Sequence, residues 1–272
     1  MYLLTGFPNA GKSTLINLLT KNKVSIVSPK VQTTQTNITG VLNSKTTQLI
    51  FTDTPGLVFK KKYIKKNISR SVLDKEMHVD YNIFVMDIQR SISKETLSQI
   101  EKVNKKFKKN ILILNKIDLV KQSRLLEVSK IINEYFKFSY TFMISAKKKK
   151  GTISLLSFLM EKAPARDWIY DNKVRVDKSI NFRLSEITRE KIFNLINKEI
   201  PYLVNIDTKI IKKEKLIQVF QEICVKKNSQ KSIIIGNKGE KIKMIGTRSR
   251  IDIEKVFKKK VYLNLIVKVK DS

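Results

Sequence analysis

The sequence is poor in cysteine and histidine, and neither glycine nor proline is enriched. Cys224 is the only cysteine, so no disulfide can form within the chain and a reducing compartment is expected. His78 is the only histidine, and we interpret it as a helix-surface residue rather than a catalyst. With 8 glycines and 5 prolines the chain is not of low complexity, and 42% hydrophobic residues suffice for packed cores.

Long apolar runs are also absent. No uninterrupted run approaches the roughly 20 residues that a membrane-spanning helix needs. A recognisable motif begins already at Gly6, which leaves no room before it for a signal peptide. The sequence therefore predicts a soluble, cytoplasmic protein, and its 272 residues are enough for two domains.

Acidic residues are scarce relative to basic ones. The chain has 55 Lys and Arg against 24 Asp and Glu, a net charge of +31. Such an excess attracts polyanions, with nucleic acid the first candidate. An alternative is a genome-wide compositional bias, because lysine greatly outnumbers arginine and isoleucine and asparagine are abundant. Both halves of the chain are basic, so the charge does not indicate which half binds the polyanion.

The first clear motif is the pattern GFPNAGKS at residues 6–13. It follows a short apolar strand, 2–5, and precedes a helical stretch, 14–19, which is the context that a phosphate-binding P-loop requires. Its glycines let backbone amides surround phosphate oxygens. Lys12 is expected to reach the β- and γ-phosphates and the Ser13 hydroxyl to bind Mg²⁺. The nucleotide-binding residues predicted here are Gly6, Phe7, Pro8, Asn9, Ala10, Gly11, Lys12, Ser13 and Thr14.

Further short apolar runs predict strands at 48–52, 82–86, 110–114 and 140–144. Strands alternating with helical patterns predict an α/β domain with a doubly wound, mostly parallel sheet, whose site lies at the carboxyl ends of the strands. Three of the runs end in polar motifs. Asp53 is expected to hold a magnesium-bound water and Gly56 to offer its amide to the γ-phosphate. The predicted site gains Asp53, Thr54, Pro55, Gly56, Asn115, Lys116, Asp118, Ser145, Ala146 and Lys147.

The motif Asn115-Lys116-Ile117-Asp118 indicates which base is bound. A carboxylate at Asp118 can accept hydrogen bonds from both N1–H and the exocyclic amino group of guanine. Adenine offers no such pair and would leave the carboxylate without partners, which is costly. The sequence therefore predicts GTP and GDP as ligands and argues against a P-loop kinase or ATPase.

Together GFPNAGKS, the stretch Val31–Thr36, DTPG, NKID and SAK resemble the Era family of ribosome-associated GTPases. The resemblance implies that a threonine after the P-loop helix closes on Mg²⁺. Thr34 aligns with it, and Thr33 is the neighbouring alternative. The magnesium residues are then Ser13, Thr34 and Asp53. In relatives with this pattern a P-loop asparagine, here Asn9, helps to hold K⁺. The catalytic residues implied are Lys12, Thr34, Gly56 and Asn9.

The C-terminal half carries a second pattern. Helical periodicity at 187–198 is followed by strands at 202–211 and 215–225, the sequence Gly236-Asn237-Lys238-Gly239, a helix at 240–258 and a last strand at 261–267. Gly-x-x-Gly in an α-β-β-α-α-β order is typical of an α+β KH domain of type II, which clamps single-stranded RNA. We expect a base-binding groove walled by Ile233, Ile235, Ile242 and Ile245. The RNA-binding residues predicted are Ile235, Gly236, Asn237, Lys238, Gly239, Lys241 and Lys243.

The segment from Phe182 to Lys270 also resembles the C-terminal domain of the Era family. We expect a GTPase domain at 1–166, a linker at 167–185 and a KH domain at 186–272. The resemblance implies slow GTP hydrolysis, binding of 16S ribosomal RNA, assistance in assembling the small (30S) ribosomal subunit, and a monomeric protein. Two alternatives stay open: an RNA-binding module whose GTP site is structural and does not hydrolyse, and a peripheral GTPase whose lysines bind an anionic membrane surface.

Overall fold

The computed structural model describes residues 1–27, 38–53, 79–196, 204–213 and 216–270. The chain divides into two compact units, with a boundary between Asp177 and Lys178. Within the described ranges, no helix is both long enough and apolar enough to span a membrane.

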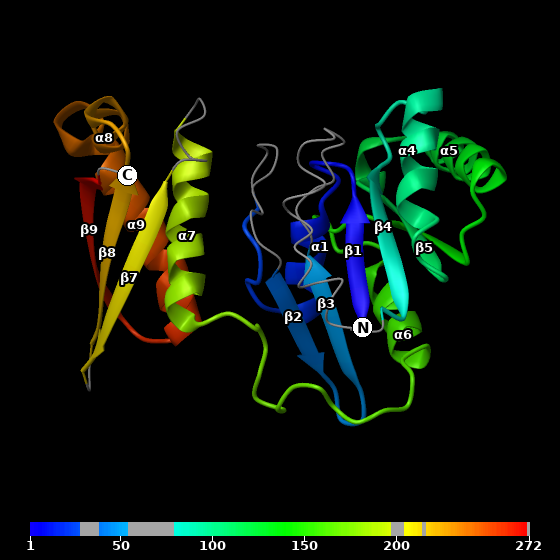
Figure 1. Ribbon diagram of the computed structural model, residues 1–272, viewed down its shortest axis with the longest axis horizontal. Coiled ribbons are helices and arrows are strands. Elements are labelled where there is room, and N and C mark those ends of the chain that lie inside the picture. Colours follow the sequence, from blue (N-terminus) through cyan, green and yellow to red (C-terminus); the bar gives the residue numbers. More distant parts are fainter. Residues whose placement is uncertain (28–37, 54–78, 197–203, 214–215, 271–272) are drawn as a thin grey trace. The chain divides into compact units, whose positions relative to one another are not determined.

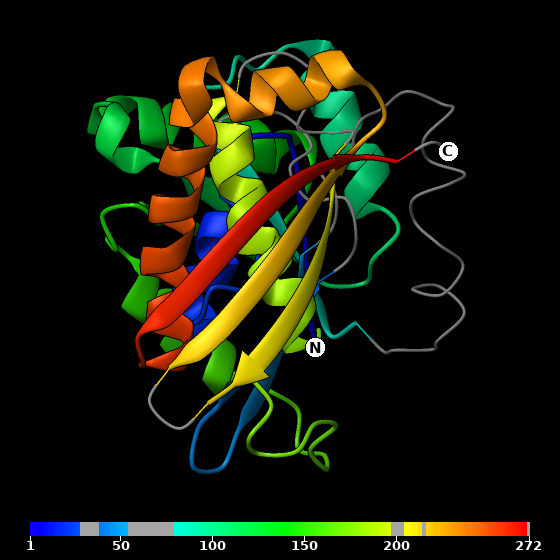
Figure 2. The same ribbon diagram turned by 90° about the vertical axis from the view of Figure 1, so that its left-hand side faces the viewer.

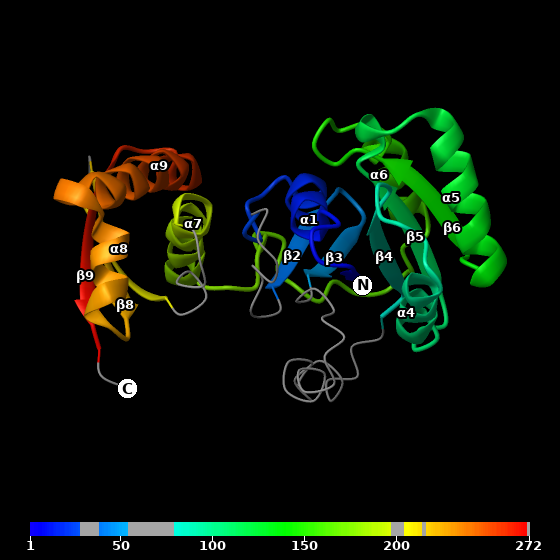
Figure 3. The same ribbon diagram turned by 90° about the horizontal axis from the view of Figure 1, so that it is seen from above.

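The first unit is built on a six-stranded sheet in the order β2-β3-β1-β4-β5-β6. All strand pairs are parallel except β2 with β3. The sheet is covered on both faces, with α1 and α6 on one side and α4 on the other (Figure 1 and Figure 3). The elements are β1 (Tyr2–Gly6), α1 (Lys12–Thr20), β2 (Ile38–Asn43), β3 (Gln48–Asp53), β4 (Tyr81–Asp87), α4 (Lys94–Asn104), β5 (Asn110–Asn115), α5 (Gln122–Tyr135), β6 (Tyr140–Ile144) and α6 (Thr152–Glu161).

Burial explains why these runs form strands. Every residue of β1 and β5 is buried, and β4 is buried except at its last residue. Strands covered on both faces are continuous apolar runs rather than alternating ones, so they are readable in the sequence. The predicted doubly wound, mostly parallel sheet is confirmed. Strand β2 was not predicted, because Thr39, Gly40 and Asn43 interrupt its apolar residues.

The segment expected to be a linker does not form a free connection. Residues 169–177 follow the edge of the sheet: Val41 N donates to Arg175 O at 2.8 Å and Asp177 N donates to Thr39 O at 3.0 Å. The Gln48 side chain accepts from Ile169 N and Tyr170 N, both at 3.0 Å. The sequence alone did not indicate this edge pairing, because backbone hydrogen bonds require no particular side chains.

The second unit has the element order that the sequence predicted, α-β-β-α-α-β. Its sheet has the order β7-β8-β9, antiparallel between β7 and β8 and parallel between β8 and β9. Helices α7 and α9 lie behind this sheet in Figure 2. The elements are α7 (Ile180–Leu195), β7 (Asn205–Lys212), β8 (Ile217–Val225), α8 (Asn228–Ile235), α9 (Glu240–Phe257) and β9 (Val261–Val269).

Helix α7 starts earlier than predicted, at Ile180 rather than near Ile187. Ser179 caps it, because its side chain accepts from Phe182 N at 3.2 Å. Its first apolar residues, Ile180, Phe182 and Leu184, fall at alternate positions, which hid this part of the helix from a search for helical apolar periodicity. The second unit therefore begins inside the range 167–185 that we expected to be a linker.

Candidate functional site

The loop between β1 and α1 has the form of a phosphate-binding loop. Its two glycines lie where no side chain fits: an added Cβ would be 2.1 Å from Val85 O at Gly6 and 2.3 Å from Asn115 Nδ2 at Gly11. Both glycines also have positive φ, 130° and 95°. A positive φ costs glycine little and other residues more. The loop therefore requires glycine at both positions, and its amides lead into the N-terminus of α1.

Lys12 is the first residue of α1 and is 7% exposed. Its Nζ donates to Gly6 O at 3.2 Å and to Phe7 O at 2.9 Å, so the ammonium is held across the loop by the loop's own carbonyls. Burial lowers the pKa of Lys12, and the charge of Asp53 opposes that shift. A charged group held in this way is positioned for phosphate oxygens.

Ser13 and Asp53, two of the residues predicted to bind Mg²⁺, lie in contact with each other. Asp53 is fully buried at the end of β3, and Ser13 Oγ donates to its Oδ2 at 2.9 Å. A hydroxyl and a carboxylate are the hard oxygen ligands that Mg²⁺ prefers, so these residues fit the ion. The predicted residues Thr34, Thr54, Pro55 and Gly56 lie outside the described residues.

Asn115 joins three of the predicted motifs. Its Nδ2 donates to Ala10 O in the P-loop at 2.8 Å, and its Oδ1 accepts from Ala146 N at 3.0 Å. The side chain is 2% exposed, so these bonds are shielded from water. The ends of β1, β5 and β6 are thereby held together by one amide.

Asp118 lies in a short 3₁₀ turn after β5 and is exposed. A hydrogen bond from the Ser145 side chain, with smaller contributions from the charges of Lys148 and Lys147, holds the pKa of Asp118 below its usual value. The carboxylate is therefore ionised at neutral pH. It is available to accept two hydrogen bonds from a base.

The second unit contains the predicted Gly-x-x-Gly loop between α8 and α9. Gly236, Lys238 and Gly239 all have positive φ, at 76°, 46° and 79°. Asn237 and Lys238 are exposed at its tip, and Lys241 and Lys243 are exposed on the first turns of α9. Ile235, just before the loop, is partly buried against the domain core. The ammonium groups of Lys238, Lys241 and Lys243 are therefore exposed at this loop and on the helix that follows it.

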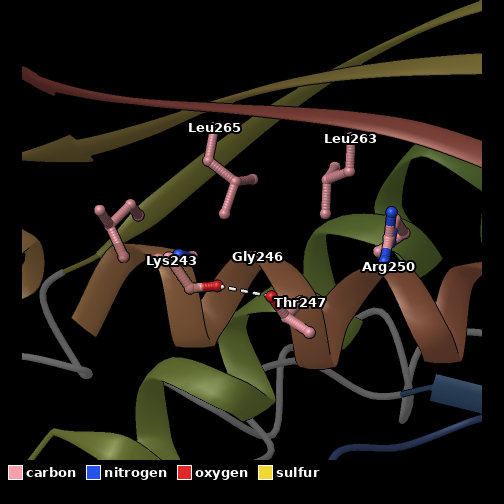
Figure 4. Close-up of a pocket in the computed structure, with 7 residues that line it drawn as sticks. Lys243, Gly246, Thr247, Arg250, Leu263 and Leu265 are labelled. Atoms are coloured by element: carbon pink, nitrogen blue, oxygen red, sulfur yellow. Dashed lines mark hydrogen bonds between the residues drawn. The ribbon is translucent and has the colours of Figure 1, made fainter. Parts of the chain in front are cut away.

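A pocket of about 380 Å³ lies between α9 and β9 (Figure 4). Gly246 forms part of its wall, and a Cβ there would be 3.4 Å from Leu265 Cδ1. Thr247 Oγ1 donates to Lys243 O at 3.0 Å along the same helix face. The pocket is lined by Ile242, Lys243, Gly246, Thr247, Arg250, Leu263 and Leu265.

The residues that we expected to wall a base-binding groove differ from those that line this pocket. Ile245 is fully buried in the domain core, and Ile233 and Ile235 pack against that core rather than line the pocket. Only Ile242 is both an expected groove residue and a residue that lines the pocket. Gly246 and Arg250 were missed, because helical spacing alone does not show which face of α9 meets β9.

Comparison with known proteins identifies the family. Residues 1–116 match the family described as "50S ribosome-binding GTPase", and residues 199–272 match the KH domain family. GTPase Era of Ehrlichia ruminantium (strain Gardel) is 36% identical over 273 residues, covering 100% of this chain and 92% of that protein. The chain belongs to the Era family of GTPases. It is therefore a P-loop GTPase with a C-terminal KH domain, as the sequence predicted.

Two solved Era structures resemble the chain along its whole length. One is Era from Aquifex aeolicus, in a variant form bound to GDP and aluminium fluoride, with a TM-score of 0.89 and 29% identity. The other is Era in complex with MgGDPNP and nucleotides 1506–1542 of 16S ribosomal RNA, with a TM-score of 0.88 and 29% identity. In each case the similarity covers 100% of this chain and 93% of the solved chain.

Proposed function

We propose that the chain uses GTP binding and hydrolysis to control its binding to 16S ribosomal RNA, and that it assists maturation of the small ribosomal subunit. The observation that carries the proposal is the Gly236–Gly239 loop, which has three positive φ angles and exposes Asn237 and Lys238 at its tip. The Era structure containing a 16S fragment supports the choice of RNA. Sequencing of RNA crosslinked to the protein in cells tests it, and recovery of no 16S fragment would contradict the target.

The description of the matched GTPase family names the 50S subunit, whereas the solved Era complex contains RNA of the small subunit. The match to that family covers residues 1–116 and excludes the KH domain. The similarity to Era covers the whole chain, including the KH domain and its loop. We therefore favour the small subunit as the partner.

In this proposal Lys12 and the P-loop amides bind the phosphates, and Asn115, Lys116 and Asp118 bind guanine, with Ser145, Ala146 and Lys147 closing over it. Ser13, Asp53 and Thr34 hold Mg²⁺, which when bound neutralises phosphate charge. Gly56 donates its amide to the γ-phosphate. Membership of a GTPase family favours hydrolysis over the alternative of a purely structural GTP site.

We further propose that the protein acts as a cytoplasmic monomer. The alternative of a peripheral membrane protein relies only on the net charge of +31. An anionic lipid surface attracts lysines without needing a loop of defined backbone geometry. The Gly236–Gly239 loop, with positive φ at residues 236, 238 and 239, therefore supports RNA as the polyanion.

The chemical step is expected to be slow and to depend on potassium. Leu57, which lies outside the described residues, follows Asp-x-x-Gly and cannot orient the attacking water with its apolar side chain. Asn9 lies in the P-loop with φ 59°, where its backbone is constrained. We expect GTP hydrolysis to be about fivefold faster in K⁺ than in Na⁺, which corresponds to about 1 kcal/mol of transition-state stabilisation.

Steady-state phosphate release in the two salts, for the wild type and for Asn9→Ala, measures this dependence. Loss of the K⁺ advantage in Asn9→Ala supports a role for Asn9 in holding the ion. If Asn9 only braces the loop, the variant loses rate equally in both salts. Equal wild-type rates in K⁺ and Na⁺ would refute the potassium proposal.

The pocket at Gly246 gives a second prediction. If an RNA base occupies it, Gly246→Val fills part of the space beside Leu265 and removes one base contact. Bases of single-stranded RNA also stack on Arg side chains, and Arg250 lines this pocket, so losing a contact of about 1–3 kcal/mol should lower RNA affinity about tenfold or more. The change does not require an unfavourable backbone, because Gly246 lies inside α9.

The matched control is Met244→Val, which also places valine in α9 but at a 44% exposed position outside the pocket. It should bind RNA like the wild type. Binding titrations at one salt concentration, with circular dichroism of both variants, separate pocket filling from a loss of helix. Equal affinities for Gly246→Val and the wild type would show that no base enters the pocket.

A further inference from the structure

Strand β4 ends in a carboxylate that the nucleotide motifs do not account for. Asp87 lies beside Asn115 in the parallel register of β4 and β5. Its Oδ2 accepts from Lys116 Nζ at 2.6 Å, and its Oδ1 accepts from Gln89 N at 3.0 Å. One oxygen of the Asp87 carboxylate therefore accepts from the backbone of the turn after β4, and the other forms an ion pair with the lysine of the guanine motif.

Lys116 is constrained at both ends. Its backbone is left-handed, with φ 68°, a conformation that lysine seldom adopts. The neighbouring Asn115 is fixed by side-chain bonds to the P-loop and to Ala146, and its carbonyl accepts from Ile88 N at 3.0 Å. The ion pair with Asp87 then fixes the far end of the side chain. A free lysine side chain has about 2 kcal/mol of rotamer entropy, so holding it in advance is worth a measurable change in affinity.

We propose that Asp87 is a positioning residue of the guanine-nucleotide site, which acts by holding the side chain of Lys116 in its binding conformation. This role is separate from base choice, which belongs to Asp118. It applies to GDP and GTP alike, because Lys116 belongs to the guanine-binding motif rather than to the γ-phosphate site. It rests on the binding of guanine nucleotides at this site.

A purely electrostatic role of Asp87 predicts the opposite change in nucleotide affinity when this residue is neutralised. If its charge only weakens the positive field of Lys116, neutralising it should strengthen the binding of an anionic nucleotide. The two side chains are 32% and 23% exposed, so water reduces any such field effect. Positioning predicts weaker binding, and the sign of the change therefore separates the two roles.

The test is the rate at which a fluorescent GDP analogue dissociates from the full chain. Asp87→Asn keeps an oxygen for Gln89 N but loses the charge that grips Lys116. Dissociation of both GDP and GTP analogues should be about five- to tenfold faster, because freeing the Lys116 side chain restores part of its rotamer entropy. Asp87→Glu should recover part of the loss, and the preference for guanine over xanthine should not change.

Two further variants separate positioning from structure. In a Lys116→Met background, Asp87→Asn should add little, because the side chain that it positions is gone. Glu101→Gln is the matched control: it breaks a 2.7 Å ion pair between Glu101 on α4 and Lys105 just after that helix, outside the site, and should leave dissociation unchanged. The melting temperature without nucleotide should be the same for Asp87→Asn and the wild type.

Unchanged or slower dissociation from Asp87→Asn would overturn the proposal. So would the full effect of Asp87→Asn in the Lys116→Met background, or a matching fall in melting temperature, because either would indicate a structural role. If the wild type bound no guanine nucleotide, the proposed function of the site would be wrong as well. Binding of the GDP analogue to the wild type is measured first, so a failure of the proposed function is distinguished from a failure of the Asp87 proposal.

Discussion

Replacing Asn237 and Lys238 by aspartate should reduce affinity for single-stranded RNA by roughly two orders of magnitude. The change places two carboxylates at the tip of the Gly236–Gly239 loop, where the proposal brings phosphates close. Hydrogen bonds to charged groups contribute about 1.5–3 kcal/mol each, so losing two of them at the lower end of that range has an effect of this size. Affinity is measured by titration with a short RNA at one fixed salt concentration, because the salt dependence itself is steep.

The loop itself should tolerate these substitutions. Lys238 has φ 46°, and aspartate is among the residues that adopt the left-handed region more readily than lysine does. The loop also precedes the N-terminus of α9, where negative charge is favourable. A loss of RNA binding therefore reflects contact with phosphate rather than unfolding, and GTP binding should be unaffected.

The control removes more charge from a different surface. Lys106 and Lys108 are exposed after α4, and changing both to aspartate removes four charge units, against three for the loop variant. Lys105 is left unchanged because it pairs with Glu101 at 2.7 Å. If diffuse charge binds the RNA, the surface variant loses more affinity than the loop variant. That outcome would contradict clamping of the RNA backbone by the loop.

Asp118→Asn should change the base that the GTPase domain prefers. An amide cannot accept from N1–H and the amino group of guanine as a carboxylate does, but its NH₂ can donate to the additional carbonyl of xanthine. Affinity for GTP should fall roughly 100-fold or more, since a site built for specific hydrogen bonds rejects a ligand that leaves them unmade. Affinity for xanthosine triphosphate should rise.

Competition binding with the two nucleotides measures the change in preference. Glu134→Gln on α5 makes the same change of charge at an exposed position and should leave the preference unaltered. The Asp118 carboxylate is exposed and contributes only a hydrogen bond with Ser145 to the folded state, so the melting temperature should change little. Tight GTP binding by Asp118→Asn would contradict the assignment of guanine recognition to this residue.

Much of the nucleotide site could be predicted because its residues follow strands that are apolar in sequence. Strands β1, β3, β5 and β6 are marked by apolar runs, and parallel strands bring their carboxyl ends to one edge. Motifs separated by about a hundred residues therefore meet, as the 2.8 Å bond from Asn115 to Ala10 shows. The edge strand β2 and the capped start of α7 were missed, since neither is a continuous apolar run.

The sequence by itself determined the class of ligand, because Gly-x-x-x-x-Gly-Lys-Ser and Asn-Lys-x-Asp place all their chemistry within a few consecutive residues. Only the tertiary structure decided which residues outside these motifs support them. Asp87 reaches Lys116 because β4 and β5 are adjacent and in register, and Gly246 opens a pocket because that face of α9 meets Leu265 on β9. Such contacts depend on packing between elements distant in the chain, and no local pattern encodes them.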